Sequence, residues 1–195
     1  YRPGTKIYFL IMYTVFWLNQ NAYHMVSLVL HGAVALLVYL LAKKLLKHSF
    51  LAGATGFLFL ILSGYSEAVH WISATGYLFS AIFILLSLLS YIATSEKTET
   101  RYGIATIVFM VLSLFFHEIG IVSPFLILVY RSIFPQFVSL RQLWSDRVSK
   151  LLLLPLPFYI LIRYASGSHW LSGDYNYNVF RLPFNIVGNA FGYLM

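Results

Sequence analysis

The chain has 195 residues, of which 60% are hydrophobic and only 10% are charged, and its net charge is +7. Soluble domains carry roughly 25% charged residues, and the mean hydropathy here is +0.79, so we expect an integral membrane protein. The chain has no cysteine, which excludes disulfides, thiolate metal ligands and a cysteine nucleophile. The basic residues lie at the ends of apolar runs rather than on one solvated face, so nucleic-acid binding is not expected.

The apolar runs predict a single, all-α domain over residues 1–195, a polytopic transmembrane helical bundle truncated at both ends. Residues 7–18 are too short to span a bilayer and are predicted to form an interfacial helix. Membrane spans are predicted at about 23–42, 50–63, 77–93, 102–116, 119–131, 151–165 and, incompletely, 184–195. Between the last two, residues 166–181 are predicted to form an extracytoplasmic loop, and residues 135–150 a cytoplasmic interfacial segment.

The 13 basic residues are divided unequally between the two ends of these spans. Nine fall on one side: Lys43, Lys44, Lys47, Lys97, Arg101, Arg131, Arg141, Arg147 and Lys150. Four fall on the other: Arg2, Lys6, Arg163 and Arg181. Cytoplasmic loops carry an excess of Lys and Arg, so the first side is predicted to be cytoplasmic. The extracytoplasmic side then holds a mixture of acids, imidazoles and bases, in which we expect an active site or ligand site: Glu67, His70, His117, Glu118, His169 and Asp174, together with Arg2, Arg163 and Arg181.

A polar, aromatic interruption between two apolar runs contains Glu67 and His70. Ionisable groups beside apolar spans are costly and indicate function, and a helix would place these two residues on one face. Helix capping in headgroup water is the alternative interpretation. The Glu-x-x-His spacing also occurs in di-iron bundles, but a second such pair is missing, so no transition-metal site is expected.

Two further groups of polar residues interrupt the apolar pattern. His24, Ser27 and His31 are spaced to line one stripe of a helix, either as the polar wall of a cavity or as side chains satisfied within the bundle. His117 and Glu118 lie where one span turns into the next. The carboxylate of Glu118 needs a cation, for which Arg163, Arg181 or an ion is predicted, and a purely structural ion pair is equally compatible with the pattern.

The order of these motifs resembles the polytopic glycosyltransferases of the GT-C superfamily, in particular the branch of protein O-mannosyltransferases and transmembrane TPR mannosyltransferases. The resemblance covers most of residues 1–135. It rests on Tyr1-Arg2-Pro3, Asn21-Ala22-Tyr23-His24, Leu30-His31, Glu67-Ala68-Val69-His70-Trp71 and His117-Glu118-Ile119-Gly120 with Pro124. Many relatives have Lys-Glu where this chain has His117-Glu118.

The resemblance implies transfer of a mannose-like hexose from a polyprenyl- or dolichyl-phosphate donor to an acceptor protein, lipid or glycan at the extracytoplasmic face. It also implies that the main catalytic aspartate lies upstream of Tyr1. The candidate catalytic residues here are Glu67 and Glu118. The candidate substrate-binding residues are Arg2, His24, His31, His70, His117 and Arg163. No metal ligands are assigned, and a divalent cation stays open as a cofactor. The expected partners are the lipid-linked sugar donor, membrane lipids and the acceptor. A transporter or flippase of lipid-linked saccharides is the alternative function, followed by a non-catalytic scaffold.

Overall fold

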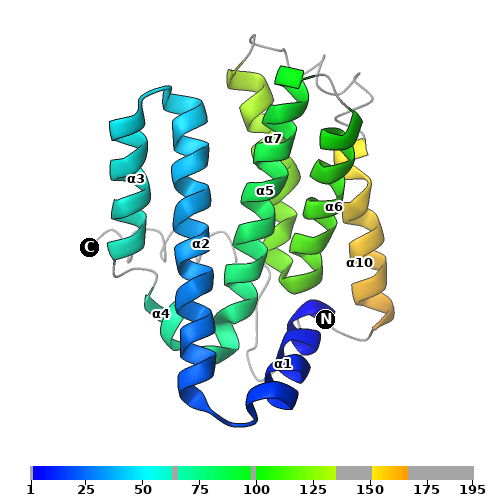
Figure 1. Cartoon of the computed structure of the whole chain (residues 1–195). Helices are drawn as coiled ribbons and strands as arrows, with labels where there is room; N and C mark the ends of the chain where they lie inside the picture. Colours follow the sequence, from blue (N-terminus) through cyan, green and yellow to red (C-terminus); the bar gives the residue numbers. More distant parts are fainter. Residues whose placement is uncertain (1, 63–65, 98–99, 135–150, 167–195) are drawn as a thin grey trace, which may run out of the picture. The chain divides into compact units, whose positions relative to one another are not determined.

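The computed structural model describes residues 2–62, 66–97, 100–134 and 151–166, and within these ranges every regular element is a helix (Figure 1). The order is α1 (Pro3–Phe16), α2 (Gln20–Leu46), α3 (Ser49–Ile61), α4 (Ser66–His70), η2 (Ile72–Ala74), α5 (Thr75–Lys97), α6 (Thr100–Phe116), η3 (Glu118–Ile121), α7 (Val122–Ile133) and α10 (Pro155–Ala165), where η denotes a 3₁₀-helix. The predicted all-α class is therefore confirmed for the described residues.

The chain divides into two compact units. Residues Arg2–Pro157 form the larger unit, which contains the site described below. In the smaller unit the described residues, 158–166, continue α10 and end in a turn. There the Arg163 guanidinium donates a hydrogen bond from Nη1 to the hydroxyl of Tyr159 at 3.2 Å.

Successive long helices of the larger unit run in alternating directions, with α2 packed against α3 and α5, and α5 packed against α6 (Figure 1). The capping residues of α2 and α3 explain where these helices begin and end, and so where the chain reverses between them. The Asn19 side chain accepts a hydrogen bond from the Ala22 N–H at the start of α2, and Lys47 ends the helix with a φ of 53°. His48 then caps α3 by accepting from the Leu51 N–H. Two residues thus suffice to turn the chain between the two helices.

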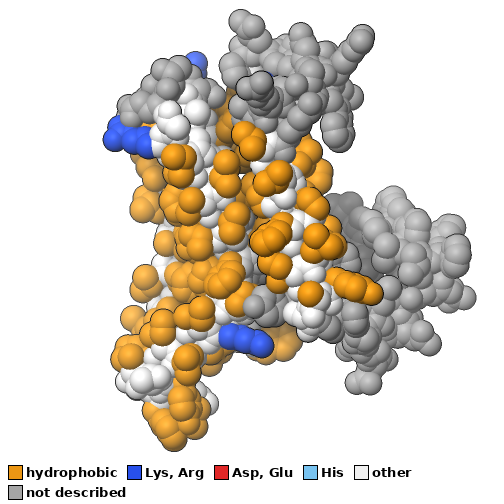
Figure 2. All heavy atoms as spheres, turned by 90° about the vertical axis from the view of Figure 1, so that its right-hand side faces the viewer, with side chains coloured by type: hydrophobic (Ala, Val, Ile, Leu, Met, Phe, Trp, Pro, Cys, Tyr) orange, Lys and Arg blue, Asp and Glu red, His pale blue; other side chains and the backbone are white. Residues whose placement is uncertain are grey.

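The α5–α6 contact combines buried apolar side chains, such as Leu88 and Met110, with hydroxyl side chains that bond across the helix pair. Ser87 donates its hydroxyl to the carbonyl of Thr106 at 2.8 Å, and Ser80 donates to the carbonyl of Ser113 at 3.1 Å. Small hydroxyl residues that bond across a helix pair are common where helices pack inside a membrane. Many other large hydrophobic side chains of the unit face outward, as for Phe50 on α3, which is 77% exposed, and hydrophobic side chains cover much of the described surface in Figure 2.

Two stretches are long and apolar enough to cross a bilayer, Gln20–Leu46 and Ile72–Thr94, while Ser49–Ile61, Thr100–Phe116 and Leu151–Ala165 are shorter apolar helices. A membrane location is supported to that extent, and the six complete spans stay a prediction. α2 extends beyond the predicted 23–42 at both ends because of its two caps. The interfacial segment 135–150, the last span 184–195 and residues 167–181 of the predicted loop lie outside the described residues.

Candidate functional site

Four of the acidic and imidazole residues predicted to form the site lie at one end of the larger unit. α4, the start of α5, the end of α6 and η3 lie at this end, whereas the α2–α3 turn, the start of α6 and the end of α7 lie at the other (Figure 1). Glu67, His70, His117 and Glu118 therefore share the first end. The second end holds Lys43, Lys44, Lys47, Arg101 and Arg131. This separation within the unit agrees with the charge distribution from which the orientation was predicted.

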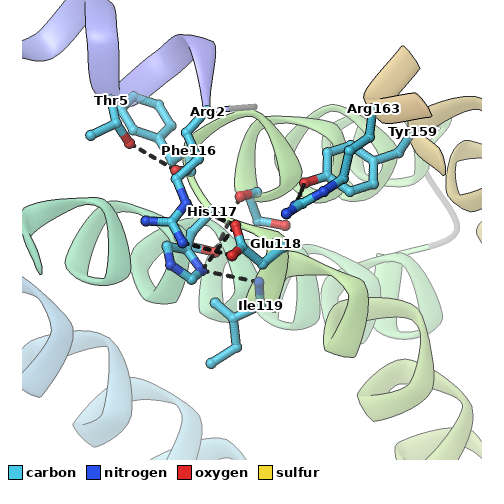
Figure 3. Close-up of polar contacts among 10 residues, drawn as sticks. Arg2, Thr5, Phe116, His117, Glu118, Ile119, Tyr159 and Arg163 are labelled. Carbon is cyan, nitrogen blue, oxygen red and sulfur yellow. Dashed lines mark hydrogen bonds and ion pairs between the residues drawn. The ribbon is translucent and has the colours of Figure 1, made fainter. Parts of the chain in front are cut away.

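Arg2 and Glu118 form a bidentate ion pair at the first end, although 116 positions separate them in sequence. Arg2 Nε donates to Glu118 Oε2 at 2.8 Å, and Arg2 Nη2 donates to Glu118 Oε1 at 2.6 Å (Figure 3). The fork of the guanidinium matches the two carboxylate oxygens and fixes their orientation. The expectation that Arg163, Arg181 or an ion would balance Glu118 was wrong in omitting Arg2, which supplies the charge.

This pairing controls the ionisation of Glu118. Burial by itself raises the pKa of the carboxyl. The hydrogen bonds from Arg2, the bond from the backbone N–H of Glu118 and the positive charge of Arg2 outweigh burial, and the pKa falls from 4.5 to about 2. Because hydrogen bonds and a nearby cation favour the charged form, Glu118 is an anion throughout the physiological range.

Helix α1 brings Arg2 to this position because it docks closely on the end of α6. Thr5 donates its hydroxyl to the carbonyl of Phe116 at 2.8 Å (Figure 3). Gly4 makes the approach possible, since a Cβ there would lie 2.9 Å from the ring of Phe115. Pro3 at the first helical position starts α1 immediately after Arg2, as proline favours.

His117 is a buried positioning residue at the start of η3. Its ring is 3% exposed, and Nδ1 accepts a hydrogen bond from the Ile119 N–H at 3.2 Å. An Nδ1 atom that accepts a bond carries no proton, so in this geometry the ring proton is on Nε2. The ring also packs against Tyr77, with centroids 3.8 Å apart. His117 therefore holds the backbone that presents Glu118.

A cavity of about 630 Å³ lies among α2, α3, α4 and α5. Its walls are mostly aliphatic and aromatic, and its polar side chains include Glu67 and His31. His31 Nε2 lies 3.2 Å from the carbonyl of Leu60, near the end of α3, and its ring stacks on Phe59 at 5.5 Å. Tyr77 and Ile119 also line this cavity, so it borders the residues that contact His117.

A second, more open cavity of about 490 Å³ is lined by Gln20, His24, His70 and Ser73 among others. The structure thus groups the predicted residues differently from the sequence. His24 and His70 share this cavity, and His31 and Glu67 share the first. Glu67 and His70 are three residues apart in the short helix α4 but line different cavities, and Trp71 lines both.

The residues that sequence reasoning missed are mainly Gln20, Ser73 and Tyr77. Nothing in their local pattern marked them, because each is a single polar or aromatic residue beside an apolar run. Within the described ranges no group of three or more His, Asp or Glu side chains is placed to hold a metal ion. Where the structure is described, the polar contacts can orient substrates and exchange protons, and Arg2 supplies a fixed positive charge.

Comparisons with known proteins give one partial match. No family model matches the chain, and no solved structure matches it. Over 92 residues the chain is 34% identical to the mouse (Mus musculus) protein O-mannosyl-transferase TMTC2. The match covers 47% of this chain and 11% of the mouse protein. This similarity suggests a relation to O-mannosyltransferases without showing that the chain belongs to that family.

Proposed function

We propose that this chain is part of a membrane glycosyltransferase of the GT-C type. It would transfer a mannose-like hexose from a polyprenyl- or dolichyl-phosphate donor to an acceptor at the extracytoplasmic face. The observation that carries the proposal is the position of the Arg2–Glu118 pair and the Glu67 cavity at the same end of the bundle. The 92-residue similarity to a protein O-mannosyl-transferase supports the same reaction class.

Arg2 is the residue proposed to face the donor phosphate. Departure of a phosphate from the sugar requires positive charge near the oxygen on which negative charge develops. The Arg2 side chain is 39% exposed, and two of its N–H groups are directed at Glu118. Glu118 therefore orients the guanidinium, and His117 orients Glu118 through the turn at η3. In this proposal Glu118 and His117 act through Arg2, while Arg163, in the smaller unit, stays a candidate for binding the donor.

Glu67 is the residue proposed to orient the acceptor. A carboxylate beside the acceptor hydroxyl can accept its hydrogen bond, which positions the oxygen for attack. Glu67 is exposed, lines the larger cavity, and no described residue forms a hydrogen bond or ion pair with its carboxylate. His31 shares its cavity, whereas His24 and His70 face the neighbouring one and are proposed to contact the sugar or its acceptor.

The test is sugar transfer by the full-length enzyme carrying Glu67→Gln. We expect expression and thermal stability to stay nearly unchanged while transfer per folded molecule falls by about tenfold or more, a change of about 1.4 kcal/mol in the activation barrier. The assay follows labelled hexose from a polyprenyl-phosphate donor into the acceptor fraction.

Glu96→Gln is the matched control, because Glu96 adjoins Lys97 on the side of the membrane predicted to be cytoplasmic. Transfer by this variant should equal that of the wild type. Equal transfer by Glu67→Gln and the wild type would remove Glu67 from the acceptor site. No transfer by the wild type with any polyprenyl-phosphate sugar would reject the proposed function as a whole.

A further inference from the structure

The larger cavity combines an apolar interior with a single acidic side chain. Residues from α2 and α5 supply much of the aliphatic wall, among them Val34, Val38, Leu78 and Ile84. Glu67 and Trp71 contribute from the segment that connects α3 to α5. At about 630 Å³ the cavity lies within the range of roughly 300 to 1,000 Å³ that holds small-molecule ligands.

The charge of this cavity restricts the head group that it accepts. Among the described residues that line it, none is Lys or Arg, and Glu67 is the only acid. A carboxylate favours hydrogen-bond donors and positive charge and repels anions. The aromatic face of Trp71 adds a surface to which an ammonium group is attracted. A phosphate or carboxylate head would therefore meet repulsion at Glu67, with no Lys or Arg among the described lining residues to offset it.

We propose that this cavity binds a single-chain amphiphile whose head donates a hydrogen bond to Glu67 and carries no negative charge. The alkyl body would lie between α2 and α5, and the head would be a hydroxyl or an ammonium group at α4. The inference goes beyond the proposed function because it concerns binding alone and holds whatever reaction follows. It also places the phosphate of any lipid-linked donor outside this cavity.

The experiment compares three probes with the same brominated chain: bromoundecanol, bromoundecylamine and bromoundecanoate. Bromine quenches tryptophan fluorescence on contact, and Trp71 lines the cavity and is 66% exposed. The full chain is placed in nanodiscs of dioleoylphosphatidylcholine, and each probe is titrated in. Quenching by probe dissolved in the bilayer rises linearly, so the saturable component reports bound probe, and substitution of Ala81, which lines only the larger of the two cavities that Trp71 borders, assigns it to that cavity. Trp71→Phe identifies the signal that comes from this residue.

We expect saturable quenching by the amine and the alcohol, with the amine at least about tenfold tighter than the carboxylate. Glu67→Gln should reduce the difference in affinity between the amine and the carboxylate to about threefold or less. This variant should still bind the alcohol. Ala81→Phe places a ring in the cavity and should abolish the saturable component for all probes. Ala81→Leu occupies less of the cavity volume and should weaken this component. Ala105→Phe, on α6 and outside the lining, should leave it intact.

Three results would overturn the inference. The first is tighter binding of the carboxylate than of the alcohol. The second is a probe preference that Glu67→Gln does not change. The third is saturable quenching that survives both substitutions of Ala81. Because no sugar donor is present in this experiment, failure here is independent of the transfer assay that tests the proposed function.

Discussion

The ion pair between Arg2 and Glu118 gives a quantitative prediction about acid stability. The pKa of Glu118 is lowered from 4.5 to about 2 in the folded chain. A group whose pKa is lower in the folded state contributes stability above its unfolded pKa and loses it as the pH falls through the folded value. The contribution of Glu118 is therefore complete above about pH 5 and disappears between pH 4.5 and about 2.

The size of the effect follows from the same shift. A fall in pKa from 4.5 to about 2 corresponds to at most about 3.4 kcal/mol of unfolding free energy. Arg2 is 39% exposed and Glu118 is 28% exposed, so solvent screens part of the interaction. We therefore expect the Arg2–Glu118 pair to contribute about 1 to 2 kcal/mol to the free energy of unfolding. This contribution exceeds the usual value for a fully exposed ion pair because the geometry is bidentate.

The assay is unfolding of the purified chain in nonionic detergent at a series of pH values from about 6 to 2. Glu118→Gln should be less stable than the wild type at pH 6 and should lose this deficit as the pH falls, because the wild type loses the pair. Arg2→Lys keeps the charge but not the fork, and should retain part of the stability. A double-mutant cycle with Arg2→Ala should give a coupling energy of about 1 to 2 kcal/mol at pH 6.

Glu67→Gln serves as the acidic control, since no described residue pairs with the Glu67 carboxylate, and at pH 6 it should change the free energy of unfolding by less than about 0.5 kcal/mol. Parallel pH profiles for the wild type and Glu118→Gln would refute the reasoning. So would a coupling energy near zero at pH 6.

Two further predictions concern topology and close packing. Lys47 and His70 are exposed at opposite ends of the larger unit. Lys47→Cys and His70→Cys should therefore react with a membrane-impermeant thiol reagent from opposite sides of the membrane. Labelling of both from one side would reject the predicted orientation. At Gly120 a Cβ would lie 2.6 Å from the backbone nitrogen of Leu114, so Gly120→Ala should lower the free energy of unfolding by about 1 to 3 kcal/mol. Gly103→Ala, where a Cβ meets nothing within 4 Å, should be neutral or stabilising by up to about 1 kcal/mol; equal effects of the two substitutions would show that Gly120 is not packed against α6.

The sequence alone was enough to predict the all-α class and the positions of the polar interruptions. Both depend on neighbouring residues: long apolar runs favour helices, and charges between such runs lie at helix ends. The locations of Glu67, His117 and Glu118 at one end of the larger unit follow from this pattern, together with the alternation of helix directions that short turns impose.

The tertiary structure alone decided which polar groups meet. Arg2 reaches Glu118 because α1 packs closely on α6 through Gly4 and Thr5, a contact that no local pattern encodes. The separation of Glu67 from His70 depends on how the short helix α4 is placed between two cavities. Helical spacing describes which residues share a face, whereas the neighbours of that face are set by the packing of distant segments. The sequence therefore predicted the candidate residues, and the packing of helices distant in sequence determined their partners.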